Sequence, residues 1–340
     1  MKYKFDKITT NYEILEKNFP KNDPNMRFFH YTSQASFFAM FKDYIDDISL
    51  EGLNGENIKY INIFASQMQY LNDKQEFIEG VKIIQNSNID TNELFESIFI
   101  ACFCGTEDLL SQWKYYGKQC GISIEFDFNE STKLCWFESI TKNTKHTPSF
   151  KYWPVISPHR VIYDNHQNIF DSIKQEVISG NIFKDVADKD AANLFVPHCK
   201  NKYFSEEDES RIILYPIKSE LANGEILFTT IDYRVSKGKI IPQFKCKVAY
   251  ADESKAQKNI PIKSIMVGPG DNQRLVFNSI INMLETNKAI VKFYTDEELD
   301  SIIKNNIKLS NNKIGIHNDR ITYNTDNNIL ISMSAAPFRD

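Results

Sequence analysis

The amino-acid sequence predicts a mixed α+β fold with a β-sheet core. Segments in which apolar and polar residues alternate are interleaved, in irregular order, with segments whose apolar residues have helical spacing. Because this order is not a regular βαβ series, a doubly wound nucleotide-binding fold is disfavoured. The chain has 340 residues, 42% of them hydrophobic and 13% aromatic, which is enough for a sizeable core. No repeat or Gly/Ser linker divides it, so residues 1–340 are expected to form one domain.

The first third of the chain is predicted to hold one strand followed by helices. Ser33 is a suitable N-cap for a helix that ends near Tyr44, and Asp90 with Glu93 forms a capping box. The expected elements are a strand over 27–32 and helices over 33–44, 72–84 and 90–100.

The rest of the chain is predicted to return repeatedly to strands. Apolar Ile122, Ile124 and Phe126 alternate with polar residues over 121–128, which predicts a half-buried strand. A helical insertion is expected around 141–200. Further strands are expected over 211–215, 226–233, 239–249, 262–267 and 329–333, and helices over 273–284 and from the capping box at 295–298 onward.

Charge and composition narrow the classes of protein. The formal charge of −5 and pI near 5.8 argue against a broadly basic surface that grips phosphates, although a local basic groove stays open. No apolar run is long enough for a membrane helix, and the N-terminus lacks the features of a secretory signal. We therefore expect a cytoplasmic protein with no membrane contact. Six scattered cysteines without C-x-x-C spacing are expected to be reduced core thiols.

Several familiar site motifs are absent from the sequence. The run from Val267 to Gly270 is glycine-rich but lacks the Gly-Lys-Ser/Thr of a phosphate loop, so we expect a turn. His198 and Cys199 have no partners at zinc-ligand spacing, so no metal is expected. There is no G-x-S-x-G elbow either.

Two polar clusters lie in the N-terminal half. In the first, strand alternation puts His30 and Thr32 on one face and Tyr31 on the other. His30 can serve a ligand, or it can be a hydrogen-bonded core histidine. In the second, Asn72 and Asp73 belong to a ligand site or simply cap the following helix.

Two more clusters follow. Trp113 and Tyr116 stand three residues apart on a short predicted helix, so they form an aromatic wall, which suits either a flat heterocycle or the core. Glu207, Glu209 and Arg211 share one face at the start of a strand. That arrangement gives a paired carboxylate site with a neighbouring guanidinium, or a solvated acidic turn with a surface ion pair.

In order and spacing, these clusters resemble the motifs of a bacterial family catalogued as domain of unknown function 2971. The resemblance runs from about Arg27 to Arg339, and no single motif is specific by itself. Its motifs are Phe29-His30-Tyr31-Thr32, Leu71-Asn72-Asp73-x-x-Glu76, Cys102-Phe103-Cys104, Ser111-x-Trp113-x-x-Tyr116-Gly117, Gly121-Ile122-x-Ile124-x-Phe126-Asp127, Phe204-x-x-Glu207-x-Glu209-x-Arg211, Ile265-Met266-Val267-Gly268-Pro269 and Ala336-Pro337-Phe338-Arg339.

That family in turn resembles a divergent branch of the ADP-ribosyltransferase superfamily. The resemblance implies a central split β-sheet with flanking helices and helical insertions, and NAD as a substrate. It implies catalytic roles for Glu209, Glu207 and His30. It implies NAD contacts for His30, Tyr31, Thr32, Asn72, Asp73, Ser111, Trp113, Tyr116 and Arg211. The chain departs from the pattern at Phe204, where the family has Trp, and at Cys102-Phe103-Cys104, where a Ser-Phe-Ser-like strand is usual.

The implied chemistry suits these residue types. Cleavage of the bond between nicotinamide and ribose builds positive charge on the sugar, and a carboxylate such as Glu209 stabilises it. Glu207 would raise the pKa of its neighbour or orient the nucleophile, whereas Arg211 would favour the ionised form. Which effect dominates stays open at this point.

The resemblance predicts an ADP-ribosyltransferase that modifies a nucleic acid or a protein, in bacterial anti-phage defence or as a toxin, with a partner or antitoxin subunit. Two alternatives stay open. The domain could have lost catalysis and act as a binding or regulatory subunit of a defence system. It could also process nucleic acid without NAD, an interpretation that the net acidity weakens.

Overall fold

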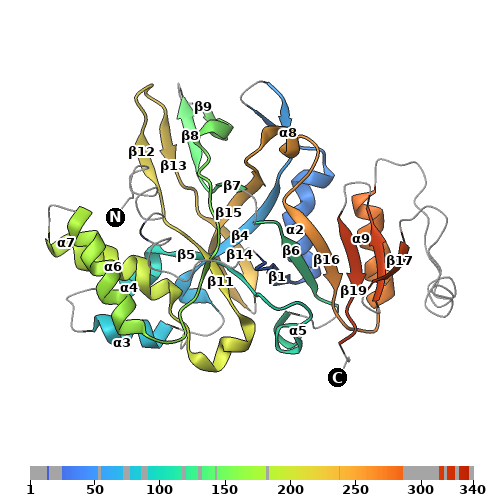
Figure 1. Cartoon of the computed structure of the whole chain (residues 1–340). Helices are drawn as coiled ribbons and strands as arrows, with labels where there is room; N and C mark the ends of the chain where they lie inside the picture. Colours follow the sequence, from blue (N-terminus) through green and yellow to red (C-terminus); the bar gives the residue numbers. More distant parts are fainter. Residues whose placement is uncertain are drawn as a thin grey trace.

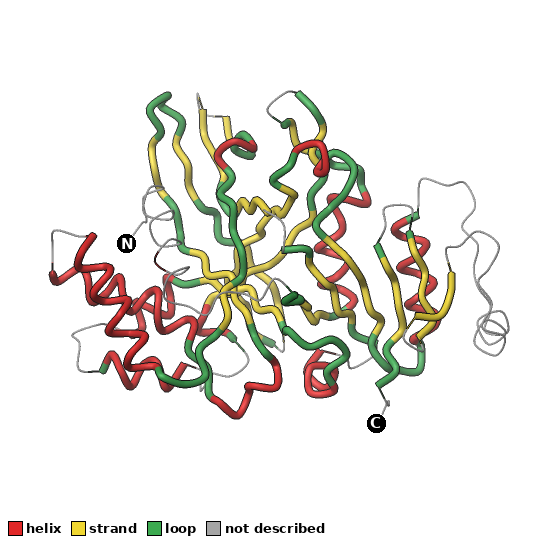
Figure 2. The backbone as a smooth tube through the Cα atoms, viewed as in Figure 1, coloured by secondary structure: helices red, strands yellow, loops and turns green. Residues whose placement is uncertain are grey.

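The fold of the chain is mixed α+β in the computed structural model (Figure 1). The described strands form two large sheets and two small ones, and most of the longer helices gather in two groups, one beside each large sheet (Figure 2). The structure describes residues 14, 25–52, 55–71, 77–85, 91–116, 120–128, 132–141, 144–180, 184–236, 238–285, 314–317, 320–325 and 329–336.

The first large sheet, here the β1 sheet, contains six described strands. In spatial order they are β1 (Phe28–Thr32), β6 (Ile122–Phe126), β16 (Ile262–Val267), β19 (Leu330–Met333), β18 (Arg320–Asn324) and β17 (Ile314–His317). Neighbouring strands are antiparallel except β16 and β19, which are parallel. Helices α2 (Gln34–Ile45) and α9 (Gln273–Leu284) lie beside this sheet (Figure 1).

The second large sheet, here the β5 sheet, contains seven described strands. In spatial order they are β10 (His159–Arg160), β11 (Ser210–Leu214), β5 (Phe99–Phe103), β4 (Ile61–Gln67), β15 (Lys239–Tyr250) and β14 (Asp232–Ser236), and β7 (Thr132–Cys135) also pairs with β15. The pairing is antiparallel throughout these described strands. The second group of helices packs against the β11 side of this sheet (Figure 1).

The remaining elements are shorter. The small sheets are β12 (Lys218–Glu220), β13 (Ile226–Phe228), β8 (Glu138–Thr141) and β9 (Thr144–His146) in one, and β2 (Leu50–Glu51) with β3 (Asn57–Ile58) in the other. The other described helices are α3 (Ile78–Ile84), α4 (Thr91–Ser97), α5 (Leu110–Tyr116), α6 (His166–Gly180), α7 (Lys184–Phe195) and α8 (Glu253–Ala256). None of the helices described here is long and apolar enough to cross a membrane.

A backbone bridge between Phe29 on β1 and Cys104, the residue after β5, joins the two large sheets. The Phe29 amide donates to the Cys104 carbonyl at 2.8 Å, and the Cys104 amide donates back at 2.7 Å. Beside this bridge, β4 pairs with β5 only through Ser66 and Gln67, although β4 pairs with β15 over most of its length. The β5 sheet is therefore splayed next to the point where β1 joins it.

The core is organised by the alternation of the central strands. Along β11, Ile212 and Leu214 enter the apolar cluster shared with the β1 sheet, whereas Ile213 enters a second cluster against α3, α6 and α7. The two sheets contact each other through aromatic rings such as Phe103 and Phe126, whose centroids are 5.5 Å apart. Both faces of β11 are consequently buried, and a polar residue on it must find its partners inside the protein.

Most of the predicted elements are confirmed, with small changes at their ends. Ser33 caps α2 by accepting a hydrogen bond from the Ser36 amide at 3.2 Å. The turn at Gly268-Pro269-Gly270 lies outside β16. Elements close to the expected ranges are β1, α2, α5, β11, β15, β16, α9 and β19. Asp90, the capping box at 295–298 and the last motif residues, 337–339, lie outside the described residues.

Three expectations about elements were wrong. The helix expected to reach Ile100 ends at Ser97, because β5 begins at Phe99. The strand expected over 226–233 is two strands, since the chain passes from the small β13 sheet to the β5 sheet between them. β6 is covered on both faces rather than one, because Arg27 and the hydroxyl of Ser264 bind Glu125, which is only 6% exposed.

A packing contact of Gly268 gives the first prediction. A Cβ at Gly268 would lie 2.7 Å from two ring carbons of Trp113 and 3.0 Å from the Gly121 carbonyl oxygen. We expect Gly268→Ala to lower the free energy of unfolding by about 1–3 kcal/mol, as overpacked sites do. Urea denaturation measures this.

The control is the double variant Gly268→Ala/Trp113→Phe. Phenylalanine lacks the ring carbons that the new methyl group would meet, so the two changes should cost less together than the sum of each alone. Strictly additive costs would show that the Trp113 contact is not what forbids a side chain at Gly268.

Candidate functional site

His30 lies on β1, next to the point where the two large sheets meet. It is half-buried, and its Nδ1 is 3.0 Å from the carbonyl oxygen of Cys102 on β5. A carbonyl can only accept, so Nδ1–H is the donor and Nε2 is left as an acceptor. Burial lowers the pKa of His30, and the nearby Arg234 guanidinium lowers it further. The imidazole is therefore neutral near pH 7, with Nε2 able to accept a hydrogen bond.

The next residue, Tyr31, points to the opposite face of β1 and belongs to the core. Its ring meets the ring of Trp113 edge-on at 4.8 Å, and its hydroxyl donates to the Thr106 carbonyl. Trp113 is 3% exposed, and its Nε1 donates to Asp108 at 2.8 Å. The structure thus places Trp113 with Tyr31, not with His30, and the two aromatic residues form a packed cluster.

The structure says less about the other residues that were predicted to contact NAD. Thr32 is buried on β1 opposite Ile122. The hydroxyl of Ser111 on α5 is buried and has no hydrogen-bond partner among the described residues. Asn72, Asp73 and the side chain of Tyr116 lie outside what the structure describes.

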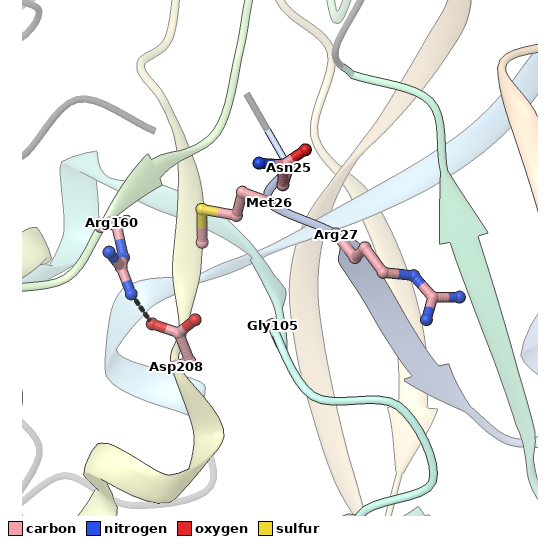
Figure 3. A pocket seen from close by; sticks show the side chains of 6 residues that line it. All are labelled: Asn25, Met26, Arg27, Gly105, Arg160 and Asp208. Carbon is pink, nitrogen blue, oxygen red and sulfur yellow. Dashed lines mark hydrogen bonds and ion pairs between the residues drawn. The ribbon is translucent and has the colours of Figure 1, made fainter. Parts of the chain in front are cut away.

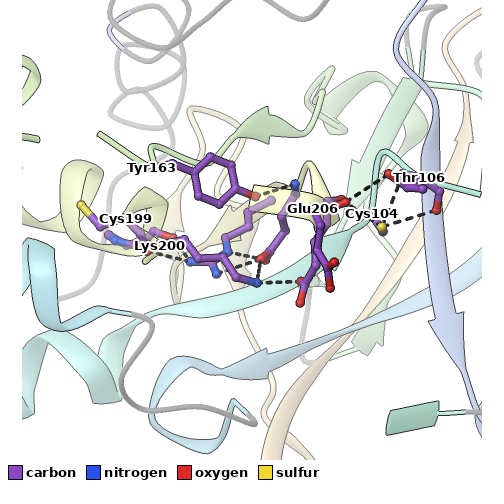
Figure 4. A network of polar contacts seen from close by, with 10 residues as sticks. Cys104, Thr106, Tyr163, Cys199, Lys200 and Glu206 are labelled. Carbon is purple, nitrogen blue, oxygen red and sulfur yellow. Dashed lines mark hydrogen bonds and ion pairs between the residues drawn. The ribbon is translucent and has the colours of Figure 1, made fainter. Parts of the chain in front are cut away.

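The fourth predicted cluster forms a buried network of charges at the start of β11 (Figure 4). Arg211 donates from Nε to Oε1 of Glu209 at 2.6 Å and from its second terminal nitrogen to Oε2 at 3.2 Å. Lys200 lies between the carboxylates: its Nζ binds Glu209 and is 2.8 Å from Oε2 of Glu207. Arg211 is 0% exposed and Lys200 is 2% exposed. Two cations and two carboxylates therefore balance each other inside the protein.

The network is fixed by the backbone around it. Arg211 also donates to the carbonyl of Pro197 at 2.6 Å, and its guanidinium lies 5.0 Å above the ring of Phe77. The amide of Lys200 donates to the Ile162 carbonyl, and the amide of Glu209 donates to the hydroxyl of Tyr163 at 3.0 Å. These contacts place the charged groups in one geometry before any ligand arrives.

The two carboxylates differ electrostatically. Burial alone would raise the pKa of Glu209, but Arg211 and Lys200 outweigh it and hold that pKa well below its usual range. Burial raises the pKa of Glu207, and Lys200 only partly opposes the increase. Glu209 is consequently ionised near pH 7, whereas Glu207 is the easier of the two to protonate.

Two histidines border the network. His159 and His198 are 9% and 1% exposed, and their rings meet edge-on at 6.0 Å. Burial lowers the pKa of His159 to about 4. Burial, His159 and Arg211 together hold the pKa of His198 well below its usual range. Both rings are therefore neutral in the folded protein near pH 7.

One strand separates His30 from the charge network. The β5 and β11 register puts Cys102 directly opposite Arg211, and the Cys102 carbonyl is the group that orients His30. β5 thus lies between His30 and the Glu209–Arg211 pair: the His30 ring packs beside Phe103, on the side of the first apolar cluster, whereas Arg211 packs over Phe77 in the second cluster. Chemically, this region offers paired carboxylates, two cations and a neutral imidazole.

A small cavity is bordered by Asp208, the residue between the two glutamates (Figure 3). It measures about 220 Å³ and is lined by Asn25, Met26, Arg27, Gly105, Arg160 and Asp208. Asp208, which separates Glu207 from Glu209 in the chain, is ion-paired with Arg160. Arg27 is bound to Glu107 and Glu125. Each guanidinium of the cavity is thus already neutralised. Nowhere in the described ranges do three His, Cys, Asp or Glu side chains gather as a metal site would require.

Sequence reasoning missed Lys200 and Tyr163. Lys200 follows an apolar stretch without any motif, and its partners come 7 and 9 residues later, beyond a turn. Tyr163 contacts Glu209 from 46 residues away. Only the fold puts these groups beside the carboxylates, so no local pattern would have identified them.

The comparisons with known proteins bear on this same region. Residues 112–212 match the family model described as "Protein of unknown function (DUF2971)". The match begins within α5 and ends within β11, so it includes Lys200, Glu207, Glu209 and Arg211. Comparisons with curated proteins and with solved structures gave no match.

The histidine pair predicts an acid-sensitive fold. An unfolded histidine has a pKa near 6.5, whereas His159 in the fold has a pKa of about 4 and His198 is also depressed. As the pH falls below 6.5, these histidines become protonated in the unfolded chain but stay neutral in the folded one. The free energy of unfolding therefore falls. Between pH 7.5 and 5.0 we expect a loss of about 2 kcal/mol from His159 and a further loss from His198, measured by urea denaturation.

The exposed His146 provides the control, because its side chain is 40% exposed. His146→Gln should keep the pH dependence, whereas His159→Gln should reduce it. A free energy of unfolding that is constant over this pH range would contradict neutral, buried histidines.

Glu209 affects stability in a separate pH range. Its contribution to the free energy of unfolding is complete above pH 4.5 and is lost only as the pH falls below that value.

Proposed function

We propose that the protein is an NAD-dependent ADP-ribosyltransferase whose reaction centre lies at the carboxylates of Glu207 and Glu209, with His30 across β5. One observation carries the proposal. A preorganised pair of carboxylates, bound by Lys200 and Arg211, lies at the start of β11 in the splayed β5 sheet, and His30 on β1 binds the carbonyl of Cys102, the residue paired with Arg211. The splayed sheet agrees with the split sheet that the family resemblance implies.

A fixed carboxylate suits the chemistry of this transfer. Bound NAD supplies the ADP-ribosyl group, since its nicotinamide leaves with the bonding electron pair and the sugar becomes positively charged. A negative group held in place before the reaction stabilises such a charge without reorganisation. Arg211 and Lys200 keep a carboxylate ionised even though it is buried.

His30 suits a binding role in the same site. Its Nδ1–H is committed to the Cys102 carbonyl, and Nε2 can accept a hydrogen bond from a hydroxyl or an amine of the substrate. Because the ring is neutral, it adds no positive charge against the pyridinium of NAD. This geometry supports a binding role for His30 rather than a role in proton transfer.

The family resemblance completes the proposal. We propose a nucleic acid or protein as acceptor, a role in bacterial anti-phage defence or as a toxin, and a partner or antitoxin subunit that controls it. The net charge of −5 favours acceptors that are captured by a local site rather than by a broadly basic surface.

A second candidate function has an observation in its favour. Glu209 is only 4% exposed and both of its oxygens are occupied by Arg211 and Lys200. Such a group can be purely structural. A domain of this kind would bind NAD or a related nucleotide as a regulatory subunit without cleaving it.

The test begins with the wild-type protein and NAD. We expect binding by calorimetry, release of nicotinamide, and transfer of label from NAD to DNA, RNA or protein. His30→Asn keeps a donor near the Cys102 carbonyl but removes Nε2, so NAD binding should weaken about tenfold, which is the loss of one hydrogen bond. Thermal stability should be nearly unchanged.

Glu206→Gln is the matched control, because Glu206 is exposed and its side chain lies outside the charge network. It should bind NAD as the wild type does. Binding without turnover, with every acceptor class tried, would favour the regulatory subunit. Absence of NAD binding would contradict both candidates.

A further inference from the structure

We propose that Glu207, not Glu209, is the carboxylate that contacts the substrate, and that Glu209 is a positioning residue acting through Lys200. This inference rests on the proposed function, which it makes more specific. It departs from the role expected for Glu209 from the family resemblance.

The contacts of Glu209 leave no place for a ligand. Oε1 accepts from Nε of Arg211 at 2.6 Å, and Oε2 accepts from the second terminal nitrogen of Arg211 at 3.2 Å and also from Lys200. The side chain is 4% exposed. For Glu209 to reach a substrate, Arg211 would lose its carboxylate in a place where it is 0% exposed, which is strongly unfavourable for a buried cation.

Glu207 has the opposite pattern. Its side chain is 14% exposed, and its Oε2 accepts from Lys200 at 2.8 Å. Its Oε1 accepts no hydrogen bond from any residue in the described part of the chain. An acceptor that is partly exposed and takes no hydrogen bond from the described residues can accept one from a ribose hydroxyl.

The backbone of Glu207 is nevertheless held firmly. Its carbonyl accepts from the Gly105 amide at 3.0 Å and from the Cys104 thiol at 2.9 Å. The next residue, Asp208, has a left-handed φ of 43°, which forms the sharp bend between the two glutamates. Cys104 also forms the bridge that joins the two large sheets. The sheet junction thus sets the position of Glu207.

Lys200 links the two carboxylates. It is 2% exposed, its Nζ contacts both side chains, and Nζ also lies 5.1 Å from the ring centroid of Phe204. Glu209 holds one side of the ammonium group, so that Lys200 is presented to Glu207 at a fixed place. In this arrangement Lys200 favours the ionised form of Glu207 without covering its second oxygen.

The transfer step then balances as follows. The bond between the ribose carbon and the nicotinamide nitrogen breaks, and its electron pair leaves on nicotinamide. The acceptor's nucleophile forms the new bond to that carbon, and its proton passes to water. Glu207 accepts the hydrogen bond of a ribose hydroxyl and opposes the developing positive charge through its own negative charge. No oxidant or reductant is required.

Chemical labelling tests the geometry without relying on activity. Wild-type protein is treated with a carbodiimide and glycine ethyl ester, and the labelled glutamates are located by fragmentation mass spectrometry. We expect labelling at Glu207, either as the ester adduct or as a cross-link to Lys200, and protection of Glu209. The exposed Glu206 serves as the fully labelled reference. Labelling of Glu209 ahead of Glu207 would overturn the proposal.

The same labelling with NAD present tests the contact. NAD should slow the labelling of Glu207 at least fivefold and leave that of Glu206 unchanged. If NAD binds but does not slow labelling at Glu207, the proposed contact is wrong. If NAD slows labelling but no acceptor is modified, the contact stands and the failure belongs to the proposed transferase function.

Variants then separate the two roles. Glu207→Gln should lower the rate of nicotinamide release about 100-fold or more, as loss of a preorganised charge does, with unchanged thermal stability. Glu209→Gln should mainly lower the melting temperature, because Arg211 loses its charged partner. Full activity of Glu207→Gln, or a loss of activity in Glu209→Gln at wild-type stability that is as large as the loss in Glu207→Gln, would reverse the assignment.

Lys200 provides the readout that a merely structural role would not change. Lys200→Met should shift the acidic limb of the pH–rate profile to higher pH, because Glu207 would then be ionised only at higher pH. Lys200→Arg should restore the wild-type profile at least in part. A Lys200→Met profile identical to the wild type would contradict the linkage from Glu209 through Lys200 to Glu207.

Discussion

The buried ion pair of Arg211 with Glu209 is the constraint on which much of the structure depends. Arg211 stands on a strand whose two faces are both covered by apolar clusters, and its side chain has no route to water. A buried cation in this position requires a carboxylate and further acceptors. Glu209 provides the carboxylate, and the carbonyl of Pro197 provides an additional acceptor. These contacts hold the segment that precedes β11 alongside the strand. Lys200, which belongs to that segment, therefore lies next to the carboxylates.

The junction of the two large sheets connects this ion pair to His30. β5 lies between β11 and the bridge to β1, so one short strand carries both the partner of Arg211 in register and the carbonyl that orients His30. The thiol of Cys104 donates to the Glu207 carbonyl at the end of the same strand. A shift of β5 by one residue would turn its side chains to the other face and disconnect all three contacts. The geometry of the candidate site is therefore a property of strand register rather than of a flexible loop.

Sequence patterns predicted the local features of this fold and missed the long-range ones. The spacing of α9 and the cap at Ser33 depend on neighbours in the chain, and both were predicted correctly. The apolar run from Ile98 to Phe103 was assigned in part to a helix, since a strand buried on both faces lacks the alternation that would identify it. The site shows the same division. Strand alternation was enough to group Glu207, Glu209 and Arg211. Lys200 and Tyr163 come close to them only through the tertiary fold, which no local pattern encodes.

Burying the charge network has a free-energy cost, and this cost bears on the role of the network. Four charged groups removed from water lose hydration, and replacing a buried ion network by apolar side chains of similar size is often neutral or stabilising. Stability alone therefore does not explain why two cations and two carboxylates meet beside β5. Within the network, three of the four side chains have at most 4% exposure, and only Glu207 keeps a partly accessible carboxylate. A cluster that presents one carboxylate oxygen without a donor among the described residues is better suited to receive a hydroxyl group than to hold a fold together.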